Sequence, residues 1–186
     1  MRELPIVGGT PTGHLGRDCV AFPAGSDVVT SIAEIGLADG TIELDLAVSG
    51  QRSFPGLAWR LNGATYESFF VRPHQMGNPD AIQYTPVFND VSAWQLYHGD
   101  GFWSPTRFPL NEWFTIRVAF AGDRGEAFVA DMKWNLPRGR RACGDGLPQS
   151  IGHLWRNVGR CLGLGVAHPV AMGDRPSRPA HRTERH

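Results

Sequence analysis

The side chains best suited to ligand chemistry gather between Phe54 and Trp103. Aromatic rings can lie against the apolar faces of sugar rings, while amide, guanidinium and imidazole groups can hydrogen-bond to hydroxyl groups. This mixture of side chains is typical of carbohydrate sites. The residues selected as ligand-binding candidates are Arg60, Glu67, Arg72, His74, Gln83, Tyr84, Gln95, Tyr97 and Trp103.

Three carboxylates could instead perform acid–base chemistry: Glu43, Asp45 and Glu67. Retaining hydrolysis of a glycosidic bond needs a nucleophile and an acid/base carboxylate about 5 Å apart. Glu43 and Asp45 alternate along one expected strand, so the simpler interpretation is a pair of solvent-facing acids. Glu67 could also form a buried ion pair with Arg60 or Arg72. Structural ion pairs shift the pKa of a carboxylate as readily as catalytic sites do, so Glu67 could have either role.

Other kinds of site have no signal in the sequence. The chain has no phosphate-binding glycine loop, no nucleophile-elbow motif and no cluster with metal-ligand spacing. Cys19, Cys143 and Cys161 fit neither a zinc motif nor a disulfide framework, which favours a reducing compartment. We therefore expect no cofactor and no bound metal.

The overall charge gives no support for binding to nucleic acid or to an acidic membrane. Its 18 Lys and Arg are balanced by 18 Asp and Glu. No apolar run approaches the roughly 18 residues of a membrane helix, and the first residues show no secretory signal pattern. We expect a cytoplasmic protein, whose oligomeric state the sequence does not indicate.

Short strands must position the candidate side chains. Segment 41–48 alternates apolar and polar residues, as half-buried antiparallel strands do, and segment 112–120 does the same. Hairpin chemistry at 121–125 predicts a return strand over 126–131. The strands expected in the central block are 56–60, 66–72 and 93–97. In the last of these, Trp94 and Leu96 would share one face and Gln95 and Tyr97 the other, one of the two pairs being core.

Segment 73–86 is predicted to be a long, ordered loop that holds binding groups. Its prolines at 73, 79 and 86 each fix the backbone and restrict the preceding residue. A restrained loop loses little entropy on binding, so its side chains can be arranged in advance. The side chains expected to border one cleft are Arg72, His74, Gln83 and Tyr84, with Trp103 as a wall.

Several segments resemble the concanavalin A-like lectin and glucanase domains, most closely the laminin-G-like bacterial group. The similar segments are Asp-Gly-Thr-Ile-Glu-Leu-Asp at 39–45, Gly-Leu-Ala-Trp-Arg at 56–60, and the segments 66–74, 79–88 and 92–97. The resemblance implies a two-sheet jelly roll whose concave face often binds carbohydrate. In the glucanases an acid/base Glu follows the Asp on the same strand, whereas Ala47 and Val48 stand in its place here.

The resemblance covers residues 17–132, after an irregular segment at 1–16, and the remaining residues differ in composition. Residues 1–132 carry 8 basic and 15 acidic side chains, a net charge of −7, and residues 133–186 carry 10 and 3, a net +7. The tail could be a basic extension without regular structure. It could also be an out-of-frame reading of a GC-rich gene, since it lacks the closing strands usual in such domains.

The sequence therefore predicts an all-β, two-sheet antiparallel jelly-roll sandwich of the concanavalin A-like type with an irregular C-terminal tail. The expected function is binding of an oligosaccharide or polysaccharide without catalysis. One alternative is a glycoside hydrolase that uses Glu43, Asp45 and Glu67. The other alternative is a protein-interaction module, which a flat apolar face with few rings would favour.

Overall fold

The structure is a computed structural model of the 186-residue chain. It describes the backbone of residues 8–23, 27–36, 39–137, 150–156 and 160–162, and the side chains of residues 8–23 and 39–137. In this part of the chain, no helix has the length and apolar composition needed to span a bilayer.

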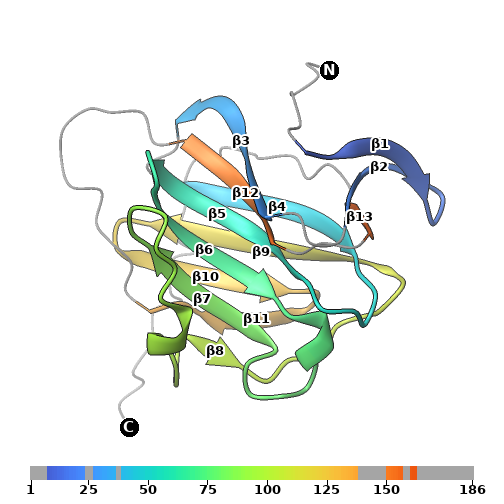
Figure 1. The fold of residues 1–186 in the computed structure, drawn as a ribbon. Helices are drawn as coiled ribbons and strands as arrows, with labels where there is room; N and C mark the ends of the chain where they lie inside the picture. The colour runs from blue at the N-terminus through green and yellow to red at the C-terminus, as the bar shows by residue number, and fades with distance from the viewer. Residues whose placement is uncertain (1–7, 24–26, 37–38, 138–149, 157–159, 163–186) are drawn as a thin grey trace, which may run out of the picture.

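Two antiparallel sheets lie face to face, one in front of the other in the view of Figure 1. The seven-stranded sheet has the order β1 (Thr10–His14), β2 (Arg17–Phe22), β13 (Arg160–Leu162), β4 (Gly40–Ala47), β9 (Trp113–Ala121), β10 (Arg124–Val129) and β11 (Met132–Asn135). The six-stranded sheet has the order β3 (Asp27–Gly36), β12 (Ser150–Arg156), β5 (Phe54–Asn62), β6 (Thr65–Val71), β7 (Ile82–Val87) and β8 (Trp103–Ser104). This arrangement confirms the predicted two-sheet sandwich.

The main core lies between the sheets and follows the alternation of the sequence. On β4 and β9 the apolar faces are buried as predicted, and Leu44 stands directly opposite Ile116. The six-stranded sheet contributes Trp59, Phe69 and Tyr84 to the same cluster. Burial of each large apolar side chain is worth about 1.5–3 kcal/mol, so this cluster dominates the stability of the domain.

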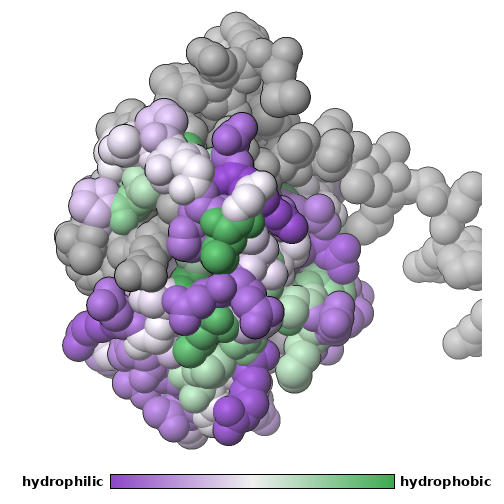
Figure 2. All heavy atoms as spheres, turned by 90° about the vertical axis from the view of Figure 1, so that its right-hand side faces the viewer, coloured by the Kyte–Doolittle hydropathy of each residue, from purple (hydrophilic) through white to green (hydrophobic). Residues whose placement is uncertain are grey.

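The six-stranded sheet also buries residues on its other face. Ala58, Tyr66, Phe70 and Val87 form a second, smaller cluster there. Because side chains alternate along a strand, neighbours in sequence such as Phe69 and Phe70 belong to different clusters. The central strands of this sheet are therefore covered on both faces. On the face of the molecule shown in Figure 2, hydrophilic side chains predominate among the described residues and hydrophobic ones form small groups.

Two elements of the central block differ from the sequence prediction. The segment predicted as a strand at 93–97 contains a short 3-10 helix, η2 (Trp94–Leu96). The predicted loop at 73–86 contains the 3-10 helix η1 (Pro73–Gln75) and most of strand β7. Strand β7 was missed because every residue in it is buried and two of its three outward side chains, Gln83 and Thr85, are polar, so its sequence does not mark a face that meets water.

Pro86 lies in β7, where it was expected to restrain a loop. Strand β8 pairs only with Ile82 and Gln83, so the half of β7 that holds the proline has a strand neighbour on one side only. A residue without a backbone N–H is tolerated at such an edge.

Both terminal segments contain strands. The segment predicted as irregular at 1–16 contains β1, which pairs with β2 across a turn where Leu15 and Gly16 have positive φ. β11 crosses the expected domain boundary at 132. In the segment predicted as an irregular tail, β12 lies between β3 and β5, and β13 lies between β2 and β4. A strand paired on both edges gains a full ladder of hydrogen bonds even without alternating side chains.

Residues 138–149, 157–159 and 163–186 lie outside the described residues, so both interpretations of the tail stay predictions.

Candidate functional site

Three of the predicted site residues form a buried polar network inside the sandwich. Arg60 lies at an irregularity of β5, where the pairing with β6 shifts and its φ is +54°. Its Nη1 donates to Glu67 Oε1 over 2.9 Å, and the Tyr84 hydroxyl donates to Glu67 Oε2 over 3.1 Å. Arg60 also donates to the carbonyl of Gly122. The predicted ion pair of Glu67 with Arg60 is therefore confirmed.

The same network corrects the prediction that Tyr84 borders a ligand cleft. Its ring is 3% exposed and lies in the main core, 6.0 Å from the ring of Trp59. Burial raises the pKa of the Tyr84 hydroxyl above its ordinary value, and the charge of Glu67 and its hydrogen bond add to the rise. Tyr84, Arg60 and Glu67 hold the core together and do not line a cleft.

The carboxylates of the hydrolase alternative lie apart. Glu43 and Asp45 alternate with buried residues of β4, so they point away from the core on the seven-stranded sheet. Arg117 donates to Glu43 over 3.4 Å. Asp45 accepts from Thr115 over 2.6 Å and from Arg17 of β2 over 3.1 Å. Glu67 belongs to the other sheet and points inward. The structure thus removes the residue set on which the hydrolase alternative was based.

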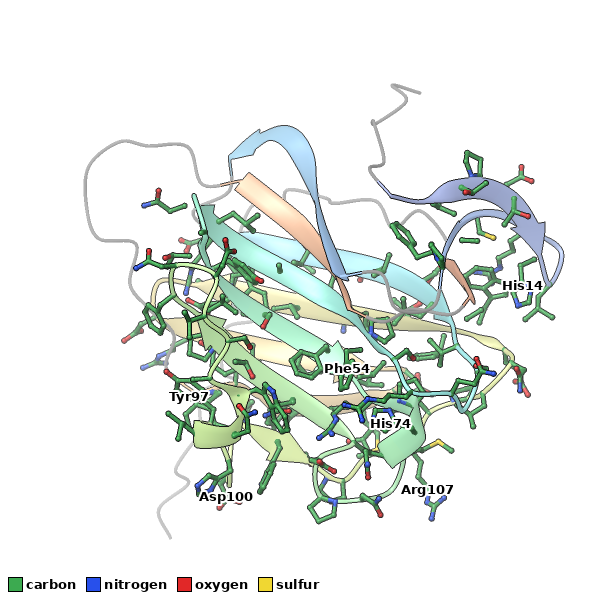
Figure 3. All side chains as sticks on the ribbon, viewed as in Figure 1. His14, Phe54, His74, Tyr97, Asp100 and Arg107 are labelled. Atoms are coloured by element: carbon green, nitrogen blue, oxygen red, sulfur yellow. The ribbon has the colours of Figure 1, made fainter. Side chains whose placement is uncertain are left out.

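A second group of predicted residues does come together, on the outer face of the six-stranded sheet. The guanidinium carbon of Arg72 lies 5.6 Å from the ring of Phe54 and 5.4 Å from the ring of Trp94. His74 packs edge-on against the same Phe54, with ring centres 5.3 Å apart, and Figure 3 shows these two side chains next to each other. An ion pair with Asp80 holds the end of the Arg72 side chain.

Four polar atoms on this face are buried without a hydrogen-bond partner in the described part of the chain. They are Arg72 Nε, His74 Nδ1, Gln83 Oε1 and Thr85 Oγ1. A buried polar group left unpaired costs about 1–3 kcal/mol, so native structures rarely keep several together without a reason. Gln83 and Thr85 are both 0% exposed, so their oxygen atoms are closed to solvent in this structure. The outer-face site is defined as Phe54, Arg72, His74, Gln83, Thr85 and Trp94.

His74 presents a neutral imidazole to this site near pH 7. Burial lowers its pKa below the ordinary value of 6.5, and the positive charges of Arg72 and then Arg52 lower it further, against a smaller opposing effect of Asp80. A neutral imidazole has one donor nitrogen and one acceptor nitrogen. Arg52 also lies over the Phe54 ring, at 5.6 Å.

The segment around η2 covers one side of the outer-face site. The Gln83 amide donates to the carbonyls of Trp94 over 3.0 Å and of Tyr97 over 3.4 Å, so the strand fixes the position of this segment. The Tyr97 ring packs against Phe102 at 5.5 Å, and Gln95 is exposed. Trp94 itself is 36% exposed at the rim of the site.

Sequence reasoning therefore missed part of the site. Trp94 was weighed as a core residue, but the 3-10 helix turns it toward Arg72. Thr85 follows Gln83 by two positions and would have been found if 82–87 had been predicted as a strand. Phe54 carried no signal beyond its place at the start of β5.

Trp103 lies at another feature, here called the edge pocket. This cavity of about 420 Å³ lies where β8 of one sheet approaches β11 of the other. Trp103 stands opposite Gln83 in the β7–β8 pairing, but its ring contacts His98, at 5.7 Å. Trp103 thus lies one strand away from Gln83, and the rings that pack on Arg72 are those of Phe54 and Trp94. In the described part of the chain, no group of three or more His, Cys, Asp or Glu is placed to hold a metal ion.

No protein-family model and no curated protein matches the chain. Solved structures do match. The carbohydrate binding module CBM66 from Bacillus subtilis is 13% identical with a TM-score of 0.53, over 89% of this chain and 91% of the module. The galectin LEC-6 of Caenorhabditis elegans is 14% identical with a TM-score of 0.54, over 79% of this chain and 94% of that one. For galectin-Ib of Xenopus laevis the identity is 12% and the TM-score 0.53, over 77% and 100%.

This likeness shows the fold. All three matched proteins have concanavalin A-like jelly-roll folds, in agreement with the two sheets described above. The finer resemblance to the laminin-G-like group stays a prediction.

Proposed function

We propose that this domain binds a carbohydrate at the outer-face site. The observation that carries the proposal is the grouping of Arg72 and His74 with the rings of Phe54 and Trp94 on the outer face of the six-stranded sheet. Sugars combine hydroxyl groups with apolar C–H faces, and this face offers both complements. The fold is shared with a carbohydrate binding module and with galectins, which supports the same interpretation.

The expected affinity is weak. Stacking on one or two rings and a few hydrogen bonds are offset by the loss of rotational and translational freedom on association. An oligosaccharide should bind with a Kd on the order of micromolar to millimolar. The arrangement of the carboxylates gives no support to the hydrolase alternative, because Glu67 points inward on the other sheet from Glu43 and Asp45.

The proposal is tested by binding of the full chain to an array of oligosaccharides, followed by calorimetry with the best ligand. Trp94→Ala should weaken binding by about ten-fold, the effect of losing about 1.4 kcal/mol of ring contact. Leu96→Ala is the matched control, because Leu96 lies in the same 3-10 helix and is 77% exposed. Failure to bind any glycan, or equal losses in both variants, would exclude the outer-face site.

A protein-interaction module remains the second candidate because one surface segment displays apolar side chains. The exposed apolar residues of this segment are Phe88, Val91, Trp94 and Leu96. Exposed apolar side chains that form one patch mark interaction sites, and these four lie within nine residues of the chain. Under this alternative Leu96→Ala and Val91→Ala would weaken capture of a protein partner, and no oligosaccharide would compete with that partner.

A further inference from the structure

The edge pocket is built from both sheets and shares no residue with the outer-face site. Its walls include Asp100, Trp103 and Ser104 from β8 and the turn before it, and Lys133, Trp134 and Asn135 from β11. A volume of about 420 Å³ lies within the range of small-molecule sites, roughly 300–1,000 Å³. Figure 3 shows Asp100 on a different part of the molecule from Phe54 and His74.

Two charged side chains of opposite sign line the pocket, Asp100 and Lys133. Lys133 is neutralised by Glu126, whose Oε1 lies 2.7 Å from the ammonium nitrogen, and Lys133 also lies over the Phe128 ring at 6.0 Å. Asp100 is exposed and has no ion pair with any described residue. The uncompensated charge of the wall is therefore the single carboxylate of Asp100.

The remaining wall groups define the shape of a suitable ligand. Trp103 supplies an indole ring, a group that attracts cations and packs against the C–H faces of sugars. The Trp134 ring packs inward against Phe69, with ring centres 5.8 Å apart. A carboxylate without a partner favours a ligand with a positive charge and opposes one with a negative charge.

We propose that the edge pocket is a second binding site, specific for an amino sugar, that is, a hydroxylated ring carrying a protonated amine. The ammonium group lies against Asp100, and the sugar ring packs against the indole of Trp103. The proposal does not depend on the outer-face site, because the two sites have no residue in common.

Three probes that share one ring separate the effect of charge from the effect of shape: glucosamine, glucose and glucuronate. Each is titrated into the full chain at about pH 6, where an ordinary amine is protonated and a carboxyl group is ionised. The indole N–H signals of Trp103 and Trp134 are followed by NMR. Glucosamine should bind about five-fold more tightly than glucose, since a partly exposed ion pair is worth up to about 1 kcal/mol. Glucuronate should bind more weakly than glucose.

Asp100→Asn should abolish the preference for glucosamine and leave the binding of glucose unchanged. Asp131→Asn is the matched control, because Asp131 is an exposed acid directly before β11 that does not line the pocket. A second readout is ionic strength, because the preference of the unaltered protein should fall as added salt screens Asp100. Equal binding of all three probes, a preference that survives in Asp100→Asn, or no change of either indole signal would overturn the proposal.

Discussion

The buried network of Arg60, Glu67 and Tyr84 gives the sharpest prediction of stability. The side chains of Arg60 and Glu67 are 6% and 4% exposed, and their charged atoms are 2.9 Å apart. Glu67→Gln keeps the size of the side chain and an oxygen that can accept from Tyr84, but it removes the charge that compensates Arg60. A buried ion pair broken on one side costs about 3–5 kcal/mol. Domains of this kind are typically stable by about 5–15 kcal/mol, so the loss would be a large fraction of the total.

The chain offers a matched control for this substitution. Glu43 is also a strand glutamate paired with an arginine, but the pair with Arg117 is longer, at 3.4 Å, and both side chains are 41% exposed. Exposed pairs contribute about 0–1 kcal/mol. Glu43→Gln should therefore change the free energy of unfolding by less than about 1 kcal/mol, although the chemical change is identical.

The assay is urea unfolding of the two variants and the unaltered chain, followed by tryptophan fluorescence. A third variant, Arg60→Met with Glu67→Gln, removes both charges and should recover part of the loss, because the uncompensated buried charge is gone. Equal free energies of unfolding for Glu67→Gln and Glu43→Gln would refute the reasoning, and so would a double variant less stable than Glu67→Gln alone.

The further predictions concern three residues: Tyr84, His74 and Gly56. Tyr84→Phe removes a hydrogen bond to a charged group and should cost about 1.5–3 kcal/mol. Because the pKa of the Tyr84 hydroxyl is raised in the folded protein, the unfolded chain releases the hydroxyl proton at a lower pH. The unaltered protein should therefore lose stability as the pH rises above about 10. In urea titrations at several pH values, Tyr84→Phe should show a smaller loss. The pKa of the His74 imidazole is lowered in the folded protein, so the unfolded chain binds a proton there at a higher pH. The free energy of unfolding should therefore fall as the pH drops below about 6.5, and it should fall less in His74→Gln. A Cβ on Gly56 would lie 2.7 Å from the Cα of Phe70 on the neighbouring strand, so Gly56→Ala should destabilise the domain by about 3 kcal/mol. Thermal unfolding measures this loss. An unchanged Tm would contradict the register of β5 and β6.

The fold was predictable where one face of a strand meets water. Strands β4 and β9 alternate apolar and polar residues because their outer faces are solvated, and this pattern fixed both their type and their buried faces. Strand β7 is buried on both faces and carries Gln83 and Thr85 on its outer side, so its sequence is like that of a loop. η2 has an apolar-polar alternation at 94–97 that mimics a strand, although its backbone turns every three residues.

The candidate site was predictable in residue type but not in grouping. Arg72, His74 and Gln83 were selected for their hydrogen-bonding groups, and the structure places all three on one face. Tyr84 was selected by the same chemistry but points inward, because its position on β7 has the opposite phase to Gln83. Which side chains of a strand point inward cannot be assigned when the strand itself is not recognised. Because β7 was not predicted, Tyr84 was placed on the wrong face.

The most direct test of the proposed function is an NMR titration of the full chain with the oligosaccharide that binds best on an array. The proposal predicts that the largest changes fall on the side-chain amide of Gln83, the imidazole of His74 and the indole of Trp94, while the indole of Trp113 on the other sheet stays unchanged. Changes centred on the seven-stranded sheet, or no bound glycan at all, would contradict it.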